Sequence, residues 1–108
     1  MATESTDLRR ALELSAYPRS AKYDPQWLID TRMGPNSVWL MESLCAVMSM
    51  QSGMRVLDMG CGMAASSIFL AREFDVEVWA CDLWIDPSEN WERICRAGLE
   101  RQVYPLKA

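Results

Sequence analysis

The sequence contains no histidine among its 108 residues. It therefore lacks the side chain that most often acts as a general base near neutral pH, and that is also a common metal ligand. Four cysteines are present, but they form no Cys-x-x-Cys pair of the kind that zinc modules use. They are Cys45, Cys61, Cys81 and Cys95. We therefore expect no metal site, and no chemistry that depends on histidine.

Long apolar segments and basic runs are also missing. No apolar run approaches the ~20 residues that a membrane-spanning helix needs, and the polar N-terminus, MATESTDLRR, has no signal-peptide core. The formal net charge is −4, which disfavours binding to nucleic acids and to anionic membranes. We expect a cytoplasmic protein with reduced thiols and with neither kind of partner.

Residues 1–50 are expected to be a helical segment that precedes and covers the rest of the domain. Ser5 or Thr6 can cap a first short helix, and Asp24-Pro25 is a start signal for a second. A third and longer helix is expected to open at Gly34-Pro35 and to end at 51–53. Its buried face is predicted from apolar residues at helical spacing, namely Leu40, Leu44, Val47 and Met48.

Residues 51–108 alternate between strand and helix patterns. Strands are expected at 55–59, 76–81 and 103–106, with helices after Gly62 and from Asp86. Pro105 assigns the last strand to an edge or to a strand end. The predicted fold is an α/β, Rossmann-like half-sheet, β-α-β-α-β, with strand order 3-2-1 and helices before it. The last helix is expected to bury Trp91, Ile94, Cys95 and Leu99.

The turn Gly60-Cys61-Gly62 leaves a strand and enters a helix, as ligand-binding glycine loops do. Gly60-x-Gly62-x-x-Ala65 also fits the fingerprint of dinucleotide-binding proteins. Asp58, two residues before the first glycine, argues against that ligand because its carboxylate would repel a pyrophosphate. It would attract the ammonium and sulfonium groups of S-adenosylmethionine, and it can fix the amides of the loop.

The second strand ends in Asp82, about 20 residues beyond the loop, which is the usual spacing for an acid that binds ribose. Its two oxygens can accept both ribose hydroxyls. Leu83 and Trp84 follow directly and can form an apolar wall for an adenine ring. Nicotinamide enzymes also place an acid here, so Asp82 alone does not separate the two cofactor classes.

VLDMGCGMA followed by VEVWACDLW resembles motif I and the next acidic motif of class I S-adenosylmethionine-dependent methyltransferases. The segment with KYD and MGPNSVWLMESL is similar to the N-terminal cover of a bacterial and archaeal small-molecule subgroup. The resemblance implies S-adenosylmethionine as cofactor. It implies binding by Asp58, the loop 60–62, and Asp82 with Leu83 and Trp84. Tyr23, Met33 and Gly34 would belong to the cover.

The sequence departs from the family in two ways. Ala64 stands where the family has its third glycine. Family members also continue for a further half-domain, which supplies most of the substrate pocket, so neither the acceptor nor a catalytic residue can be named. A small-molecule acceptor is expected. The open first-strand edge suggests a truncated chain or a homodimer joined through that edge.

Two other interpretations stay open. One is a fragment of an NAD(P)-binding oxidoreductase, although such domains usually begin at the glycine-loop strand. The other is a non-catalytic half-domain that only dimerises. Cys61 and Cys81 both follow predicted strands and could form a redox pair, but small cysteines at such places usually only pack.

Overall fold

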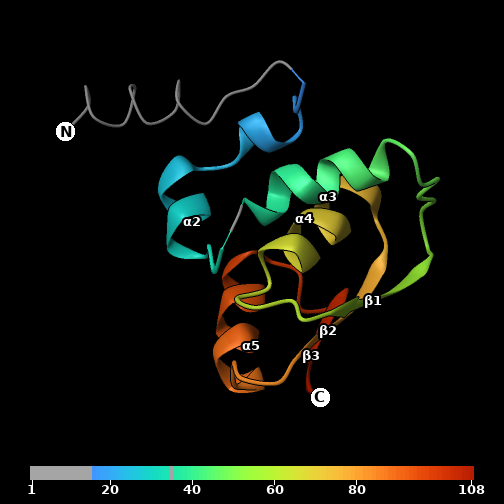
Figure 1. Ribbon diagram of the computed structural model, residues 1–108. Coiled ribbons are helices and arrows are strands. Elements are labelled where there is room, and N and C mark those ends of the chain that lie inside the picture. The colour runs from blue at the N-terminus through green and yellow to red at the C-terminus, as the bar shows by residue number, and fades with distance from the viewer. Residues whose placement is uncertain (1–15, 35) are drawn as a thin grey trace.

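The computed structural model describes residues 16–34 and 36–108 (Figure 1). The first expected helix, at Ser5 or Thr6, lies outside this range. The other expected elements are all present. In chain order they are η1 (Ser20–Lys22), α2 (Pro25–Asp30), α3 (Ser37–Cys45), β1 (Arg55–Met59), α4 (Ala65–Phe74), β2 (Glu77–Asp82), α5 (Pro87–Arg96) and β3 (Val103–Lys107).

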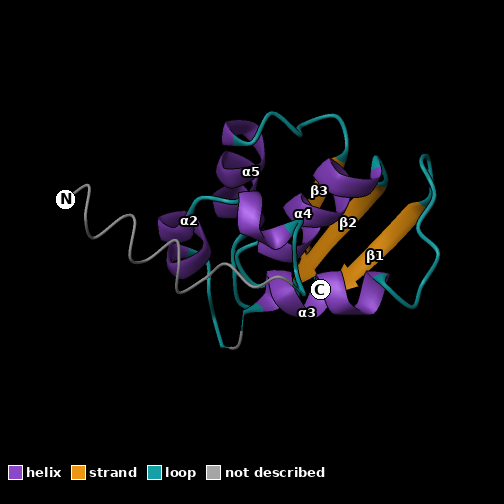
Figure 2. Cartoon of the chain, turned by 90° about the horizontal axis from the view of Figure 1, so that it is seen from above, coloured by secondary structure: helices purple, strands orange, loops and turns teal. Residues whose placement is uncertain are grey.

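The three strands form one parallel sheet in which β2 lies between β1 and β3. This confirms the predicted α/β class with parallel strands. Pro105 lies on the edge strand β3, opposite Ala80, where its missing N–H does no harm to the ladder. β1 is the other edge of the sheet (Figure 2).

One face of the sheet carries the core. Ile68 of α4 and Ile94 of α5 pack with Val78 and Val103 of the strands, and all four are fully buried. The alternate residues of the strands point the other way, because side chains alternate along a strand. The exposed apolar residues on that second face are Leu57, Met59 and Leu106. Among the described residues, no helix is long and apolar enough to span a membrane.

Both proline start signals work as predicted. The Asp24 side chain accepts a hydrogen bond from the backbone N–H of Trp27 and caps α2. The Asp86 carboxylate accepts from the N–H of Ser88 and caps α5. In both helices the proline stands in the first turn, where a backbone N–H would have no partner within the helix.

The predicted apolar face of α3 is wrong. The helix ends at Cys45, and the four residues expected to be buried are exposed, Val47 to 83%. The buried residues are instead Val38 and Glu42. The Glu42 carboxylate accepts hydrogen bonds from the backbone N–H groups of Arg19 and Ser20 and from the Ser20 hydroxyl. These bonds offset the cost of burying a charge, so a polar residue takes the inward position.

The predicted stripe of α5 needs a similar correction. Ile94 and Leu99 are buried as expected, but Trp91 and Cys95 are exposed. Asn90 is buried in their place, with only 1% of its surface exposed. Asn90 and Ile94 are four residues apart and therefore share one face of the helix. The inward face thus combines an amide with an apolar side chain.

Candidate functional site

A loop with unusual backbone angles connects β1 to α4. Gly60 and Gly62 have φ of 70° and 57°, a region that glycine enters without steric cost. A Cβ built on Gly60 would meet nothing within 4 Å, so the space over this part of the main chain is open to a ligand. Ala64 also lies in the left-handed region, with φ of 64°. This is the position of the family's third glycine, and alanine adopts this conformation at a cost of about 1 kcal/mol.

Asp58, at the end of β1, points toward the first turn of α4. Its Oδ2 atom accepts hydrogen bonds from the hydroxyls of Ser66 at 2.6 Å and of Ser67 at 2.8 Å. The carboxylate therefore fixes α4 rather than the amides of the glycine loop, which differs from the sequence-based expectation. Among the described residues, the Oδ1 atom of Asp58 accepts no hydrogen bond, so this oxygen can still accept one from a ligand.

Asp82, at the end of β2, organises two loops at once. Its Oδ1 accepts from the N–H of Gly62 at 3.0 Å. Its Oδ2 accepts from the N–H groups of Trp84 and Ile85 at 2.9 and 2.8 Å. The bond from Ile85 lowers the pKa of this carboxyl most, burial opposes it, and the bonds from Trp84 and Gly62 add to the lowering. A carboxylate has about four lone-pair sites, so one remains for a further donor.

Apolar side chains surround this pair of loops. Leu83 and Trp84 are exposed, Trp84 to 84%, which is unusual for an indole ring. On the opposite side, the Sδ atom of Met33 lies 3.1 Å from where a Cβ on Gly62 would stand. The positive φ of 57° favours glycine at position 62, and the Met33 side chain lies close above it. Met33 therefore lies beside Gly62 of the glycine loop.

Tyr23 does not lie with the apolar side chains around the glycine loop. It is buried against Phe69 and Trp27, and its hydroxyl donates to Glu73 Oε2 at 3.1 Å. Burial, followed by the charge of Glu73, raises the pKa of the phenol. Burial also raises the pKa of Glu73, but hydrogen bonds from Lys22, Tyr23 and Arg19 outweigh it and leave that pKa below its usual value.

Cys61 and Cys81 lie on adjacent segments and are both free thiols. The N–H of Cys61 donates to the carbonyl of Cys81 at 2.9 Å. Burial, together with the charges of Asp58 and Asp82, raises the pKa of the Cys61 thiol to about 12. A thiol in that state is a poor nucleophile, so the structure favours a packing role over the redox pair.

Asn90 is a residue that sequence reasoning missed. Its side-chain N–H donates to the carbonyl of Gly62 at 2.9 Å, and its Oδ1 accepts from Arg93 Nη1 at the same distance. The glycine loop is therefore held from two sides, by Asp82 through its N–H and by Asn90 through its carbonyl. The sequence did contain one signal for this residue. Asn90 stands four positions before Ile94, so both lie on the same face of the helix.

The site thus combines an open main-chain loop, two carboxylates at the ends of neighbouring parallel strands, and exposed apolar side chains. Ligands in open α/β sheets bind at this end of the strands. Carboxylates favour a ligand with hydroxyls or positive charge, and the apolar side chains favour a flat ring. Both carboxylates already accept hydrogen bonds from the chain, so the arrangement is suited to holding a ligand in a fixed place.

No protein-family model matches this sequence, and no curated protein matches it. Solved structures do resemble it. A putative sarcosine dimethylglycine methyltransferase from Galdieria sulphuraria is 25% identical over 65% of this chain, with a TM-score of 0.57. A SAM-dependent methyltransferase from Thiobacillus denitrificans, solved in complex with S-adenosyl-L-homocysteine, is 25% identical over 63%, with a TM-score of 0.55. The [4+2]-cyclase SpnF is 18% identical over 73%, with a TM-score of 0.60.

The predicted resemblance to S-adenosylmethionine-dependent methyltransferases is therefore confirmed at the level of the fold. The match covers only a part of each larger protein, namely 26%, 28% and 30% of the three structures in the same order. The cyclase shows that one fold can carry different reactions, since function depends on the site rather than on the fold.

Proposed function

We propose that this chain is the cofactor-binding N-terminal portion of an S-adenosylmethionine-dependent methyltransferase that acts on a small molecule. The observation that carries the proposal is the pairing of the glycine loop with Asp58 and Asp82 at the ends of adjacent strands. The match to two methyltransferase structures supports it.

The described residues fit this cofactor. In the proposal, the spare acceptor capacity of Asp82 takes a ribose hydroxyl, and Leu83 and Trp84 flank the adenine. The open space over Gly60 admits the methionine part close to the main chain, with the charge of Asp58 nearby and Met33 above. The cofactor itself supplies the activated methyl group, so the protein has to position the donor and exclude water.

Two alternatives are less well supported. A nicotinamide dinucleotide would bring a pyrophosphate to the loop, where Asp58 and Asp82 both carry negative charge. A cyclase activity is compatible with the fold of one neighbour, but no feature of the described site favours it. The acceptor of the methyl group is proposed only as a small molecule.

Calorimetric titration of the purified chain with S-adenosylhomocysteine tests the proposal, with NAD as the comparison. Saturable binding of the first ligand alone, lost in Asp82→Ala, is the expected result. Binding of NAD instead would favour the oxidoreductase alternative. Binding of neither would contradict the proposal that this chain holds the cofactor by itself.

A further inference from the structure

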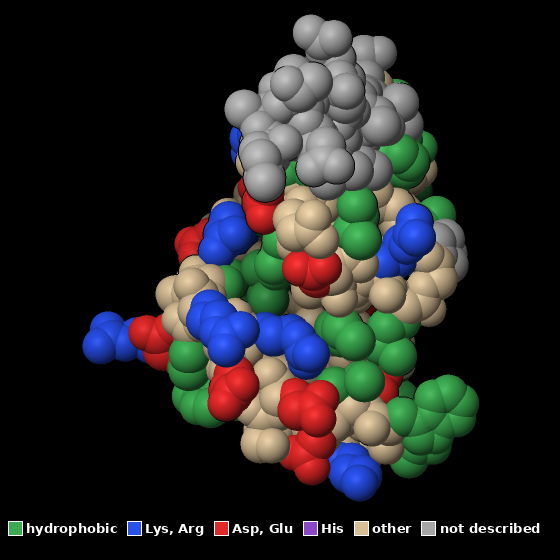
Figure 3. Space-filling model, turned by 90° about the vertical axis from the view of Figure 1, so that its left-hand side faces the viewer, with side chains coloured by type: hydrophobic (Ala, Val, Ile, Leu, Met, Phe, Trp, Pro, Cys, Tyr) green, Lys and Arg blue, Asp and Glu red, His purple; other side chains and the backbone are tan. Residues whose placement is uncertain are grey.

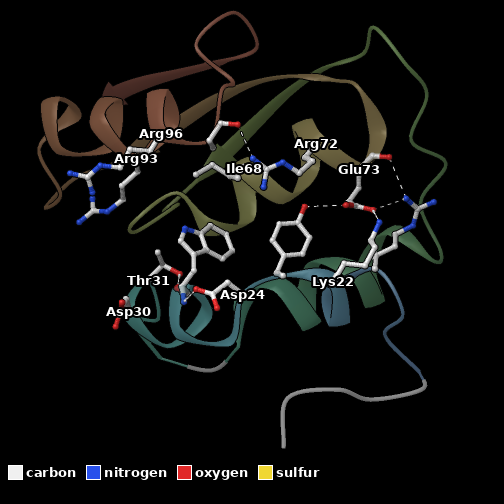
Figure 4. A pocket seen from close by; sticks show the side chains of 13 residues that line it. Lys22, Asp24, Asp30, Thr31, Ile68, Arg72, Glu73, Arg93 and Arg96 are labelled. Atoms are coloured by element: carbon white, nitrogen blue, oxygen red, sulfur yellow. Dashed lines mark hydrogen bonds and ion pairs between the residues drawn. The ribbon is translucent and has the colours of Figure 1, made fainter. Parts of the chain in front are cut away.

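A cavity lies away from the glycine loop, between α2, α4 and α5, with a volume of about 1040 Å³. Figure 4 shows α2 on one side of it and α5 on the other, with Ile68 between them, and Trp27 also lines the cavity. Five Lys and Arg side chains and three Asp and Glu side chains line this groove, which gives it a formal charge of +2. The whole chain carries −4, so the groove is a basic region on an acidic protein. Figure 3 shows Lys and Arg side chains gathered at the middle of this side of the molecule.

The acidic groups in the groove already have partners. Asp24 caps α2, and Asp30 accepts a hydrogen bond from Gln26 at 2.8 Å. Glu73, at the far end, is paired with Arg19 and Lys22 at 3.1 and 2.8 Å. The charges of Arg19 and Lys22 are therefore partly neutralised. Asp24 and Asp30 keep their negative charges, since their hydrogen-bond donors are neutral. The groove cations that form no ion pair with Glu73 are Arg72, Arg93 and Arg96.

These three arginines have most of their donors left. Arg72 donates to the carbonyl of Ala97, and Arg93 donates to the side chain of Asn90. Arg96 lies 4.0 Å from the carboxylate of Glu92, and both side chains are exposed, so this pair is weak. Each guanidinium has five N–H donors in a planar fork. Among the described residues, no carboxylate forms an ion pair with Arg72 or Arg93.

The groove is physically connected to the glycine loop. Arg93 projects into it, and its Nη1 atom holds the Oδ1 atom of Asn90 at 2.9 Å. The amide of Asn90 in turn donates to the Gly62 carbonyl. Because Asn90 is fully buried, its amide can turn only if these bonds break. Two hydrogen bonds thus connect Arg93 in the groove to the main chain of the loop.

We propose that the groove binds an organic oxyanion, a carboxylate or a phosphate carried on an apolar group. Its oxygens would bind the guanidinium groups of Arg93 and Arg96, with Arg72 as a further donor, and its apolar part would pack on Trp27. The oxyanion uses donors of Arg93 that Asn90 leaves free, so it holds Arg93 in place and stiffens the support of Gly62. Its occupancy therefore tightens cofactor binding. This last step rests on the proposed function of the glycine loop.

Titration of the full chain with phenyl phosphate, followed by ¹⁵N-resolved NMR, tests the groove without any cofactor. We expect saturable shifts on α2 and α5. Arg93→Gln and Arg96→Gln should each weaken binding roughly tenfold, the cost of one charge-assisted hydrogen bond. The matched control is Arg101→Gln, which removes the same charge from an exposed residue outside the groove. Benzoate in a parallel series separates a carboxylate ligand from a phosphate ligand.

The coupling is tested by calorimetry of S-adenosylhomocysteine with and without saturating phenyl phosphate. We expect an affinity about fivefold higher with the anion, and an equal effect of the nucleoside on the anion, because coupling is reciprocal. Arg93→Gln should abolish the coupling, whereas Arg96→Gln at a saturating anion concentration should preserve it.

The proposal is overturned if phenyl phosphate and benzoate give no saturable shifts, or if Arg101→Gln weakens binding as much as the two groove variants do. It is also overturned if the bound anion leaves the affinity for S-adenosylhomocysteine unchanged. If S-adenosylhomocysteine fails to bind in the absence of the anion, the proposed function fails separately, and the anion titration still decides the groove site.

Discussion

The carboxylate of Asp82 and the backbone N–H of Gly62 are joined by a hydrogen bond of 3.0 Å. This bond ties the end of β2 to the glycine loop that follows β1. It has two consequences. The loop is held in shape before any ligand arrives, and the negative charge of Asp82 stands directly beside the open main chain. Preorganisation of this kind reduces the entropy that binding would otherwise cost.

Replacing Asp82 by Ala should weaken binding of S-adenosylhomocysteine more than replacing Cys61 by Ala. Asp82→Ala removes three backbone contacts and the proposed ribose acceptor, a loss of about 2 to 3 kcal/mol for bonds to a charged group. Cys61→Ala removes a thiol without a strong hydrogen bond. Calorimetry of both variants measures the difference, and equal losses would argue against the proposed place of the ribose.

We expect the stability of the chain to depend on pH through the carboxylate of Asp82. Its pKa is lowered in the folded chain, so its contribution to stability is complete above the unfolded pKa of about 3.9. The contribution is lost as the pH falls through the lower, folded pKa. We expect the amide signals of Gly62 and Ile85 to shift in that acidic range. Signals that titrate above pH 4 instead would contradict the tie between these loops.

The cysteines should differ in their reaction with iodoacetamide at pH 7.5. Cys95 is exposed and should react first. Cys61 should react last, because it is buried and its pKa is raised to about 12, which leaves almost no thiolate. Mass spectrometry of a time course measures the order. Rapid modification of Cys61 in the folded chain would show that the loop opens readily.

Glu42 should be a major stabilising residue although it is charged. Its carboxylate accepts from two backbone N–H groups and one hydroxyl in a buried position. Glu42→Ala leaves these donors unpaired and should lower the free energy of unfolding by about 3 kcal/mol. Urea unfolding measures this loss. Glu92→Ala is the control, since its exposed pair with Arg96 at 4.0 Å should contribute little.

We propose that two copies of the chain associate through β1, which forms one edge of the sheet. Leu57 and Met59 are exposed on this strand, and edge strands with apolar faces tend to pair. We expect sedimentation to show self-association that Leu57→Lys abolishes. Leu106→Lys, the same change on the opposite edge strand β3, should preserve it. A monomer at all concentrations, or equal effects of the two variants, would contradict pairing through β1.

Local signals were enough to locate most elements in advance. Asp24-Pro25 and Asp86-Pro87 each begin a helix because a cap and a fixed φ act within one turn. The spacing of Asp58, Gly60, Gly62 and Asp82 located the loop and its acids, because strands and tight turns restrict the backbone over a few residues. Met33, which the resemblance assigned to a cover segment, lies beside Gly62, and no local signal in the sequence indicated this contact.

Tertiary structure decided which faces are buried and which partners the polar groups choose. Glu42 and Asn90 point inward because distant donors and acceptors at Ser20 and Gly62 satisfy them, and a periodicity of apolar residues cannot reveal such partners. Asp58 binds the hydroxyls of α4, and the basic groove collects arginines from two helices. The sequence by itself thus determined the order of elements and the glycine loop with its acids, because these depend on neighbouring residues. The supports of the loop and the basic groove depend on residues brought together only by folding.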